Sequence, residues 1–155
     1  MLTDDMKRVV AEQRLGFFAT VCEDGSPNVS PKGTTYVLDD DHLLFAEIRS
    51  PQTVANIQRG SAVEVNVVDP FVRKGYRFKG PAVVCEPGTA PYAQGLDLLR
   101  RAGSSVADRV RAIVVIEVRE ARALVSPAYD DGITTEADVI STYRARFARL
   151  HGENV

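Results

Sequence analysis

The sequence predicts a mostly β, α+β fold: a six-stranded antiparallel barrel with short helices covering its ends. Short runs rich in β-branched and aromatic residues recur along the chain. The turn signals between them are those of hairpins, which join antiparallel strands. A chain of 155 residues with 45% hydrophobic residues has the size of one domain with its own core. We therefore expect residues 1–155 to form a single domain.

The elements follow from local patterns. A helix should open the chain, because Thr3 can cap it and Met6, Val9 and Val10 recur at helical spacing. Asp24-Gly25 is typical of a tight hairpin turn. The six expected strands are Leu15–Cys22, Asn28–Leu38, Leu43–Ile48, Ala62–Val68, Phe71–Cys85 and Ala112–Val118, and Arg122–Val125 would continue the sheet. Further helices are expected at Pro51–Arg59, closed by Gly60, at Tyr92–Ala102 and at Glu136–Leu150.

Composition excludes several classes of protein. The net charge of −2 argues against sequence-independent nucleic-acid binding, which needs a strong basic excess. No apolar run approaches the length of a membrane span, and the polar N-terminus is not a secretory signal, so we expect a cytoplasmic protein. Cys22 and Cys85 belong to no metal-binding pattern and are expected to be free thiols. With only His42 and His151 besides, no metal site is expected.

One expected strand contains an unusual segment, Ser30-Pro31-Lys32-Gly33-Thr34. Pro31 cannot donate a hydrogen bond to a neighbouring strand, and Gly33 has no side chain to pack. Such residues mark a sheet edge, a bulge, or a place where another group approaches the backbone closely.

The helix expected at Pro51 has a polar start. Ser50 is a good N-cap and Pro51 suits the first helical position. Gln52 and Thr53 add side-chain donors where the helix dipole favours an anion, which makes this start a candidate phosphate site. The alternative is a well-capped helix without a ligand.

Three segments carry a family resemblance. They are LGFFATVCEDGSPNVSP, LLFAEIRSPQTVANIQRGSAVEVNVV and YRFKGPAVV, which together span roughly residues 15–85. In this order they resemble the FMN-binding split-barrel family of pyridoxamine 5'-phosphate oxidase-like proteins. The resemblance implies a split β-barrel, FMN as cofactor, and oxidoreductase activity on a small molecule.

The resemblance also implies where FMN would lie. The segment after the hairpin turn would lie under the flavin ring, the end of the next strand would line it, and the following helix start would hold the phosphate. The implied cofactor-binding residues are Ser30, Pro31, Lys32, Gly33, Thr34, Thr35, Ala46, Glu47, Ser50, Gln52 and Thr53. Gly33 would permit close approach to a flat ring, and Lys32 would favour a reduced, anionic flavin unless it is simply a solvated strand lysine. No catalytic residue is assigned.

Two departures from the family pattern keep a second class of function open. Relatives often carry Arg or Lys at the helix start, where this chain has Gln52. Neutralising the phosphate would then fall to Lys32, to Arg49, or to one of the more distant basic residues Arg73, Lys74, Arg77 and Lys79. The chain also has no Trp, whereas the true oxidases complete their substrate site with a Trp-containing C-terminal segment. The alternative to an FMN-dependent oxidoreductase is therefore a non-catalytic flavin carrier, or a module that binds a deazaflavin or haem.

The expected partners are a small-molecule substrate and a second copy of the chain. A barrel of this size leaves only a shallow groove for FMN, and a second subunit would supply the missing wall. We therefore expect a homodimer with its cofactor near the interface. The strands AVEVNVV and AIVVIEV are the expected contact surfaces. No nucleic-acid or membrane partner is expected.

Overall fold

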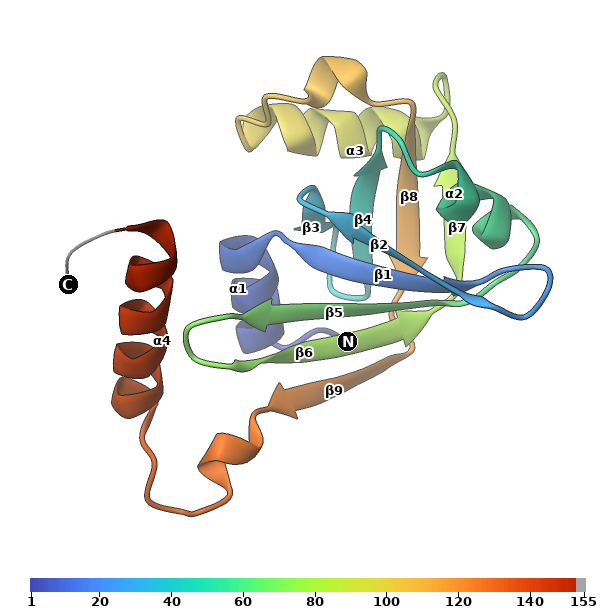
Figure 1. The fold of residues 1–155 in the computed structure, drawn as a ribbon. Coiled ribbons are helices and arrows are strands. Elements are labelled where there is room, and N and C mark those ends of the chain that lie inside the picture. Colours follow the sequence, from blue (N-terminus) through green and yellow to red (C-terminus); the bar gives the residue numbers. More distant parts are fainter. Residues whose placement is uncertain (153–155) are drawn as a thin grey trace.

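The computed structural model describes residues 1–152 and shows an α+β fold built on two antiparallel sheets (Figure 1). The larger sheet has five strands in the order β2-β1-β5-β6-β9. Their bounds are β1 Gly16–Val21, β2 Pro27–Lys32, β5 Val63–Asp69, β6 Lys74–Gly80 and β9 Glu120–Val125. The smaller sheet has four strands in the order β3-β4-β8-β7. Their bounds are β3 Thr35–Val37, β4 His42–Glu47, β7 Ala82–Cys85 and β8 Ala112–Glu117.

The expected antiparallel pairing is confirmed, but residues 1–152 form nine strands rather than the six expected. Two long expected strands are each divided between the two sheets. The first breaks at Gly33, between β2 and β3. The second breaks after Gly80, where Pro81 has no N–H to continue the ladder and a Cβ on Gly80 would collide with the Glu117 carbonyl. The remaining additional strand is β9, the expected continuation, which forms an edge of the larger sheet.

Four helices complete the described chain: α1 Asp4–Gln13, α2 Pro51–Gln58, α3 Ala90–Arg101 and α4 Glu136–His151. Short 3-10 turns, η1 Ala107–Arg109 and η2 Pro127–Tyr129, precede β8 and α4. The Thr3 side chain caps α1 as expected, since its hydroxyl accepts a hydrogen bond from the Met6 N–H. None of these helices is long and apolar enough to cross a bilayer.

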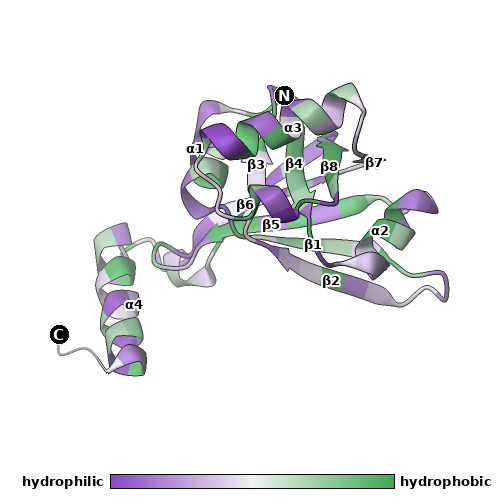
Figure 2. Ribbon diagram, turned by 90° about the horizontal axis from the view of Figure 1, so that it is seen from above, coloured by the Kyte–Doolittle hydropathy of each residue, from purple (hydrophilic) through white to green (hydrophobic). Residues whose placement is uncertain are grey.

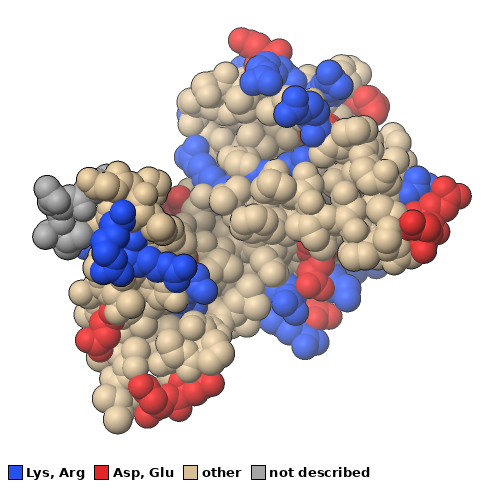
Figure 3. Space-filling model, in the orientation of Figure 1, with Lys and Arg blue, Asp and Glu red and all other residues tan. Residues whose placement is uncertain are grey.

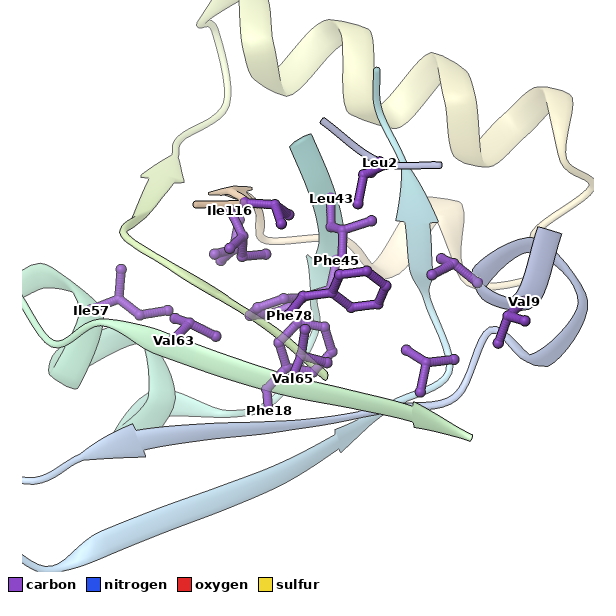
Figure 4. Packing of buried hydrophobic residues seen from close by; sticks show 14 residues of the cluster. Leu2, Val9, Phe18, Leu43, Phe45, Ile57, Val63, Val65, Phe78 and Ile116 are labelled. Atoms are coloured by element: carbon purple, nitrogen blue, oxygen red, sulfur yellow. The ribbon is translucent and has the colours of Figure 1, made fainter. Parts of the chain in front are cut away.

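The main core lies between the two sheets (Figure 4). Phe18 of β1, Phe45 of β4 and Phe78 of β6 are fully buried there, and the rings of Phe18 and Phe45 lie 4.6 Å apart. Helix α1 closes one end of this core with Val9 and Val10. The core holds β1 and β4 against each other and so fixes where their neighbours β2 and β3 separate.

A second, smaller core lies under α3. Leu99 of α3 is fully buried against the outer face of the smaller sheet. Gly95 allows this helix to lie close to β8, because a Cβ there would come within 2.7 Å of the Ile113 side chain. This packing places the loop that follows α3 beside the point where β2 and β3 diverge.

Helix α4 stands apart from both sheets rather than covering a barrel end (Figures 1 and 2). It contacts the connection between β5 and β6 and the start of β6. Phe147 packs on Phe71 at 5.3 Å between ring centroids, Tyr143 lies under the Arg73 guanidinium, and Glu136 pairs with Lys74. Only Val139 of this helix is buried. Helix α4 therefore takes no part in the site described next.

Candidate functional site

A cleft of about 610 Å³ opens where β2 leaves the larger sheet and β3 enters the smaller one. One wall is the bend Pro31–Thr34, together with Ala46 and Ile48 from the end of β4. The opposite wall is the loop Gly103–Val106 after α3, together with Arg109 of η1. The volume lies within the range of small-molecule and cofactor sites.

Gly33 lies at the centre of the bend rather than inside a strand. A Cβ added to Gly33 would meet no atom within 4 Å, so the position faces open space in the cleft. The bend is held in place by Thr34, whose hydroxyl donates to the Ala46 carbonyl at 3.2 Å and accepts from the Ala46 N–H at 3.1 Å. This rigid, uncovered stretch of backbone is a surface against which a flat ligand can lie.

Lys32 forms the floor of the cleft and is 8% exposed. Its Nζ lies 3.6 Å from Glu47 Oε2 and 5.2 Å from the centre of the Phe45 ring. Burial lowers the pKa of Lys32, and the neighbouring Glu47 carboxylate opposes that shift. The 3.6 Å separation is longer than a normal hydrogen bond, so the ammonium keeps donors for a ligand.

The start of α2 is built differently from the expected phosphate site. Ser50 occupies the N-cap position, but its side chain does not cap the helix. Instead the Glu47 carboxylate accepts hydrogen bonds from both the Ser50 N–H, at 2.5 Å, and the Ser50 hydroxyl. The expectation of a Ser50 side-chain cap is therefore wrong, because an acidic residue three positions earlier competes for that hydroxyl.

The next polar side chains of α2 also bind within the protein. Thr53 is 1% exposed and its hydroxyl accepts a hydrogen bond from the Asn28 amide at 3.0 Å. The Gln52 amide donates to Asn56 at 2.8 Å. Gln52 lines a separate surface hollow of about 460 Å³ beside the free thiol of Cys22. The Thr53 contact ties α2 to β2, and the Gln52 contact lies within α2.

The residues expected to bind the cofactor thus fall into two groups. Five of them line the cleft: Pro31, Lys32, Gly33, Thr34 and Ala46. Six do not: Ser30, Thr35, Glu47, Ser50, Gln52 and Thr53. Of these six, Thr35, Glu47, Ser50 and Thr53 are buried, and Glu47 acts on the cleft through Lys32.

Sequence reasoning missed a second set of cleft residues, all of which except Tyr36 come from parts of the chain distant from the bend. They are Arg14, Tyr36, the loop Gly103–Val106 and Arg109. Arg14 follows α1 in a left-handed conformation with a φ of 55°, and its guanidinium lies 5.3 Å from the centre of the Tyr36 ring. No local pattern marks these residues, because their position depends on how α1 and α3 pack against the sheets.

The cleft is positively charged in a chain whose net charge is −2. Arg14, Lys32, Arg49 and Arg109 line it, and no Asp or Glu of residues 1–152 does so. Lys and Arg atoms can be followed along the crevice between the α3 region and the strands below it (Figure 3). None of the more distant basic candidates lines the cleft: Lys74 pairs with Glu136 and Arg77 with Glu64. Arg73 lies over the Tyr143 ring, and Lys79 lines a separate hollow. The cleft is therefore suited to an acceptor-rich or anionic ligand.

Comparison with known proteins gives the family. Residues 2–124 match the family model described as pyridoxamine 5'-phosphate oxidase, so the chain belongs to this family. No curated protein matches the sequence significantly.

Solved structures show the same fold. HupZ of Group A Streptococcus is 31% identical with a TM-score of 0.71, over 81% of this chain and 96% of that one. HutZ, named as the heme storage protein from Vibrio cholerae, is 18% identical with a TM-score of 0.62, over 80% of this chain and 94% of that one. An FMN-binding protein from Syntrophomonas wolfei is 14% identical with a TM-score of 0.59, over 79% and 86%. The fold is therefore shared by proteins named for different cofactors.

Proposed function

We propose that this protein binds FMN in the cleft, with the flavin ring against the bend at Gly33, and that it acts as an oxidoreductase on a small molecule. The observation that carries the proposal is the open space over Gly33 in a cleft of about 610 Å³. A glycine is needed there only if something approaches the backbone, since its φ does not require one. Family membership supports a flavin as the occupant.

The chain's residues have separate roles in this proposal. A bound flavin would supply the electron-transfer chemistry, and the protein would supply orientation and charge. Lys32, held by Glu47, would place positive charge beside the ring. Arg49, which leads into α2 and lines the cleft, is the best placed residue to neutralise the phosphate, since Thr53 is buried and already hydrogen-bonded.

The cofactor itself can be identified directly. Purified protein would be denatured and the released chromophore identified by mass spectrometry, after the absorption spectrum of the native protein has been recorded. Release of FMN, and reduction of the bound flavin by a nicotinamide donor, would support an FMN oxidoreductase. Bound FMN that no donor or substrate reduces would instead indicate a flavin carrier, and a released deazaflavin would replace FMN as the cofactor.

Haem is less well supported by the cleft. Protein ligands to haem iron are His, Cys, Met or Tyr. Within residues 1–152 the cleft is lined by no His, Cys or Met, and by a single Tyr, Tyr36. The Arg14 guanidinium lies 5.3 Å from the centre of the Tyr36 ring, and Tyr36 is, among the described residues, the one lining residue whose side chain is of a type that binds haem iron. A Soret band in the purified protein would show bound haem and overturn the proposal of FMN as the cofactor.

We also propose a homodimer, but not through the strands first expected. The buried side chains of β5, Val63, Val65 and Val67, face the chain's own core, and those of β8 are buried as well. Exposed apolar residues lie instead on the outer face of β1 and β2. Phe17, at 47%, is opposite the cleft residue Pro31, and Val29, at 59%, and Val21, at 55%, extend this face towards the hairpin turn. This face would let a second subunit cover the open side of the site.

The dimer proposal can be tested by sedimentation velocity. Val29→Asp should shift the wild-type dimer towards monomer, because it places a charge in the proposed interface. Val83→Asp is the matched control, since Val83 is 64% exposed on β7, outside this face. A wild-type monomer with full flavin occupancy would refute the proposal.

A further inference from the structure

Helix α4 is weakly attached to its own chain. Of its 16 residues only Val139 is buried, and Leu150 near its end is 68% exposed. Glu136, Tyr143 and Phe147 hold it to the β5–β6 connection and the start of β6. Isolated helices of about 12–15 residues are marginal in water, and most helices are stabilised by tertiary packing of an apolar face. Part of the apolar face of α4 is therefore available to another surface.

The second half of α4 combines apolar and positively charged side chains. Phe147 and Leu150 continue its apolar side. The same half carries three exposed arginines, Arg144, Arg146 and Arg149. Residues 139–151 contain no Asp or Glu, so no acidic side chain of the helix offsets this charge. The helix also lies beyond residue 124, where the match to the family ends, and is an addition to the shared fold.

The outer face of β1 and β2 has the opposite charge. Val21 and Val29 are exposed there, close to the hairpin that joins the two strands. The hairpin, residues 22–26, presents the exposed carboxylates of Glu23 and Asp24. Residues 15–31 contain no Lys or Arg. This face and the second half of α4 are therefore complementary, since each joins exposed apolar side chains to charge of one sign.

The two surfaces lie at opposite ends of the larger sheet (Figures 1 and 3). Helix α4 is attached where Asp69 pairs with Lys74, whereas the hairpin lies beyond Ala19, which pairs with Glu64. At about 3.3 Å per residue, Glu64 and Asp69 are roughly 17 Å apart along β5, and the hairpin lies further still. The arginines of α4 therefore do not reach the hairpin of their own chain.

A second copy of the chain can bring the two surfaces together. Figure 2 shows α4 projecting past β1 and β2 on the side away from the smaller sheet, where a second subunit on this face would lie. A twofold axis between two such faces, running across the strands, reverses the strand direction of the second copy. Its hairpin then lies at the α4 end of the first copy, and the same rotation makes the reciprocal contact.

We propose that α4 binds a second copy of this chain, with its arginines against the Glu23–Asp24 hairpin of that copy and Leu150 against its Val21 and Val29. This inference rests on the homodimer proposed above, because it takes the outer face of β1 and β2 as the interface. It identifies α4 as the segment that fixes how the two subunits are oriented.

Sedimentation equilibrium of the full chain measures the dissociation constant of the dimer. Leu150→Asp should raise it at least about tenfold, because a carboxylate would be buried on apolar side chains beside two acidic residues. Val83→Asp is the matched control, since Val83 is 64% exposed on β7, away from this face. It should change the constant by no more than about twofold.

A charge exchange tests which surfaces meet. Arg146 is the arginine to change, because it lies one helical turn before Leu150 on the same side. Arg146→Glu and Glu23→Arg should each weaken the dimer about tenfold, since each brings like charges together. The double variant should return to within about threefold of wild type, because opposite charges then face each other again. Such recovery requires that the two positions interact.

The outcomes that overturn this role of α4 are distinct. They are a dimer unaffected by Leu150→Asp, or a double variant no tighter than either single variant. Dissociation by Val29→Asp but not by the α4 variants would leave the proposed dimer standing and refute only the inference about α4. A wild-type monomer would refute both, and its binding to phosphatidylserine vesicles, lost in Leu150→Asp, would assign α4 to a lipid surface. FMN content measured on the same samples tests the cofactor separately.

Discussion

Replacing Gly33 by valine tests the placement of the cofactor most directly. A side chain at this position enters open space, because a Cβ there has no neighbour within 4 Å. The φ of Gly33 is not in the left-handed region, so valine meets no backbone strain there. The apo protein should therefore fold normally. Removing a glycine where the conformation is compatible stabilises by about 0.4–1 kcal/mol, or roughly 1–4 °C in Tm at this chain length.

The same side chain would occupy the space proposed for the flavin ring. Crowding extra methyl groups into a packed contact costs about 1–3 kcal/mol. Since each 1.4 kcal/mol is tenfold in affinity, FMN binding should weaken roughly 5- to 150-fold. Gly33→Ala should give a smaller loss, so the two variants form a graded series.

The assay combines thermal denaturation of the apo protein with FMN titration. Gly16→Ala is a control at a glycine without free space, because a Cβ there would lie 2.7 Å from both Phe18 and Thr35. This variant should lower the Tm of the apo protein. Normal FMN affinity in Gly33→Val would remove the bend from the site. A fall in its apo Tm would show that the space over Gly33 is not open.

Three further predictions concern the residues around the cleft. Glu47→Gln should destabilise the fold by about 3–5 kcal/mol, because it leaves the buried Lys32 ammonium without a carboxylate. Glu64→Gln, which breaks the exposed pair with Arg77, should cost less than about 1 kcal/mol. Urea denaturation measures both free energies of unfolding, and equal effects would contradict a buried pair. Thr53→Ala should lower Tm by roughly 2–8 °C, since it removes a buried hydrogen bond worth about 1–2 kcal/mol. Gln52→Ala should leave Tm within about 2 °C. A Tm loss confined to Gln52→Ala would show that Gln52, rather than Thr53, stabilises this part of the fold. Burial lowers the pKa of Lys32 below 10.5, so between that lowered pKa and 10.5 the unfolded state binds more protons than the folded state. The stability of wild type relative to Lys32→Met should therefore rise with pH over this interval. A pH-independent difference would argue against a buried ammonium.

Local chemistry was sufficient to predict much of the fold. The Asp24-Gly25 turn forms, with Gly25 at a φ of 81°, because glycine adopts that conformation without steric cost. The start of α1 at the Thr3 cap was also predictable, since the Thr3 hydroxyl and the Met6 N–H that it accepts lie within one turn of chain. The unusual composition around Pro31 and Gly33 correctly marked the place where the chain exposes its backbone to a cleft.

The tertiary structure alone decided how these pieces form a site. Gly33 and Pro81 mark the two breaks in the sequence, but whether the chain continues in the same sheet or crosses to the other one depends on packing. The nine strands of residues 1–152 therefore followed from the tertiary structure. The ion pair of Lys32 with Glu47, and the stacking of Arg14 on Tyr36, join residues distant in sequence. No local pattern encodes such contacts, because they arise only when the core brings separate elements together. The sequence by itself therefore determined where the backbone opens, and only the tertiary structure decided which charges surround that opening.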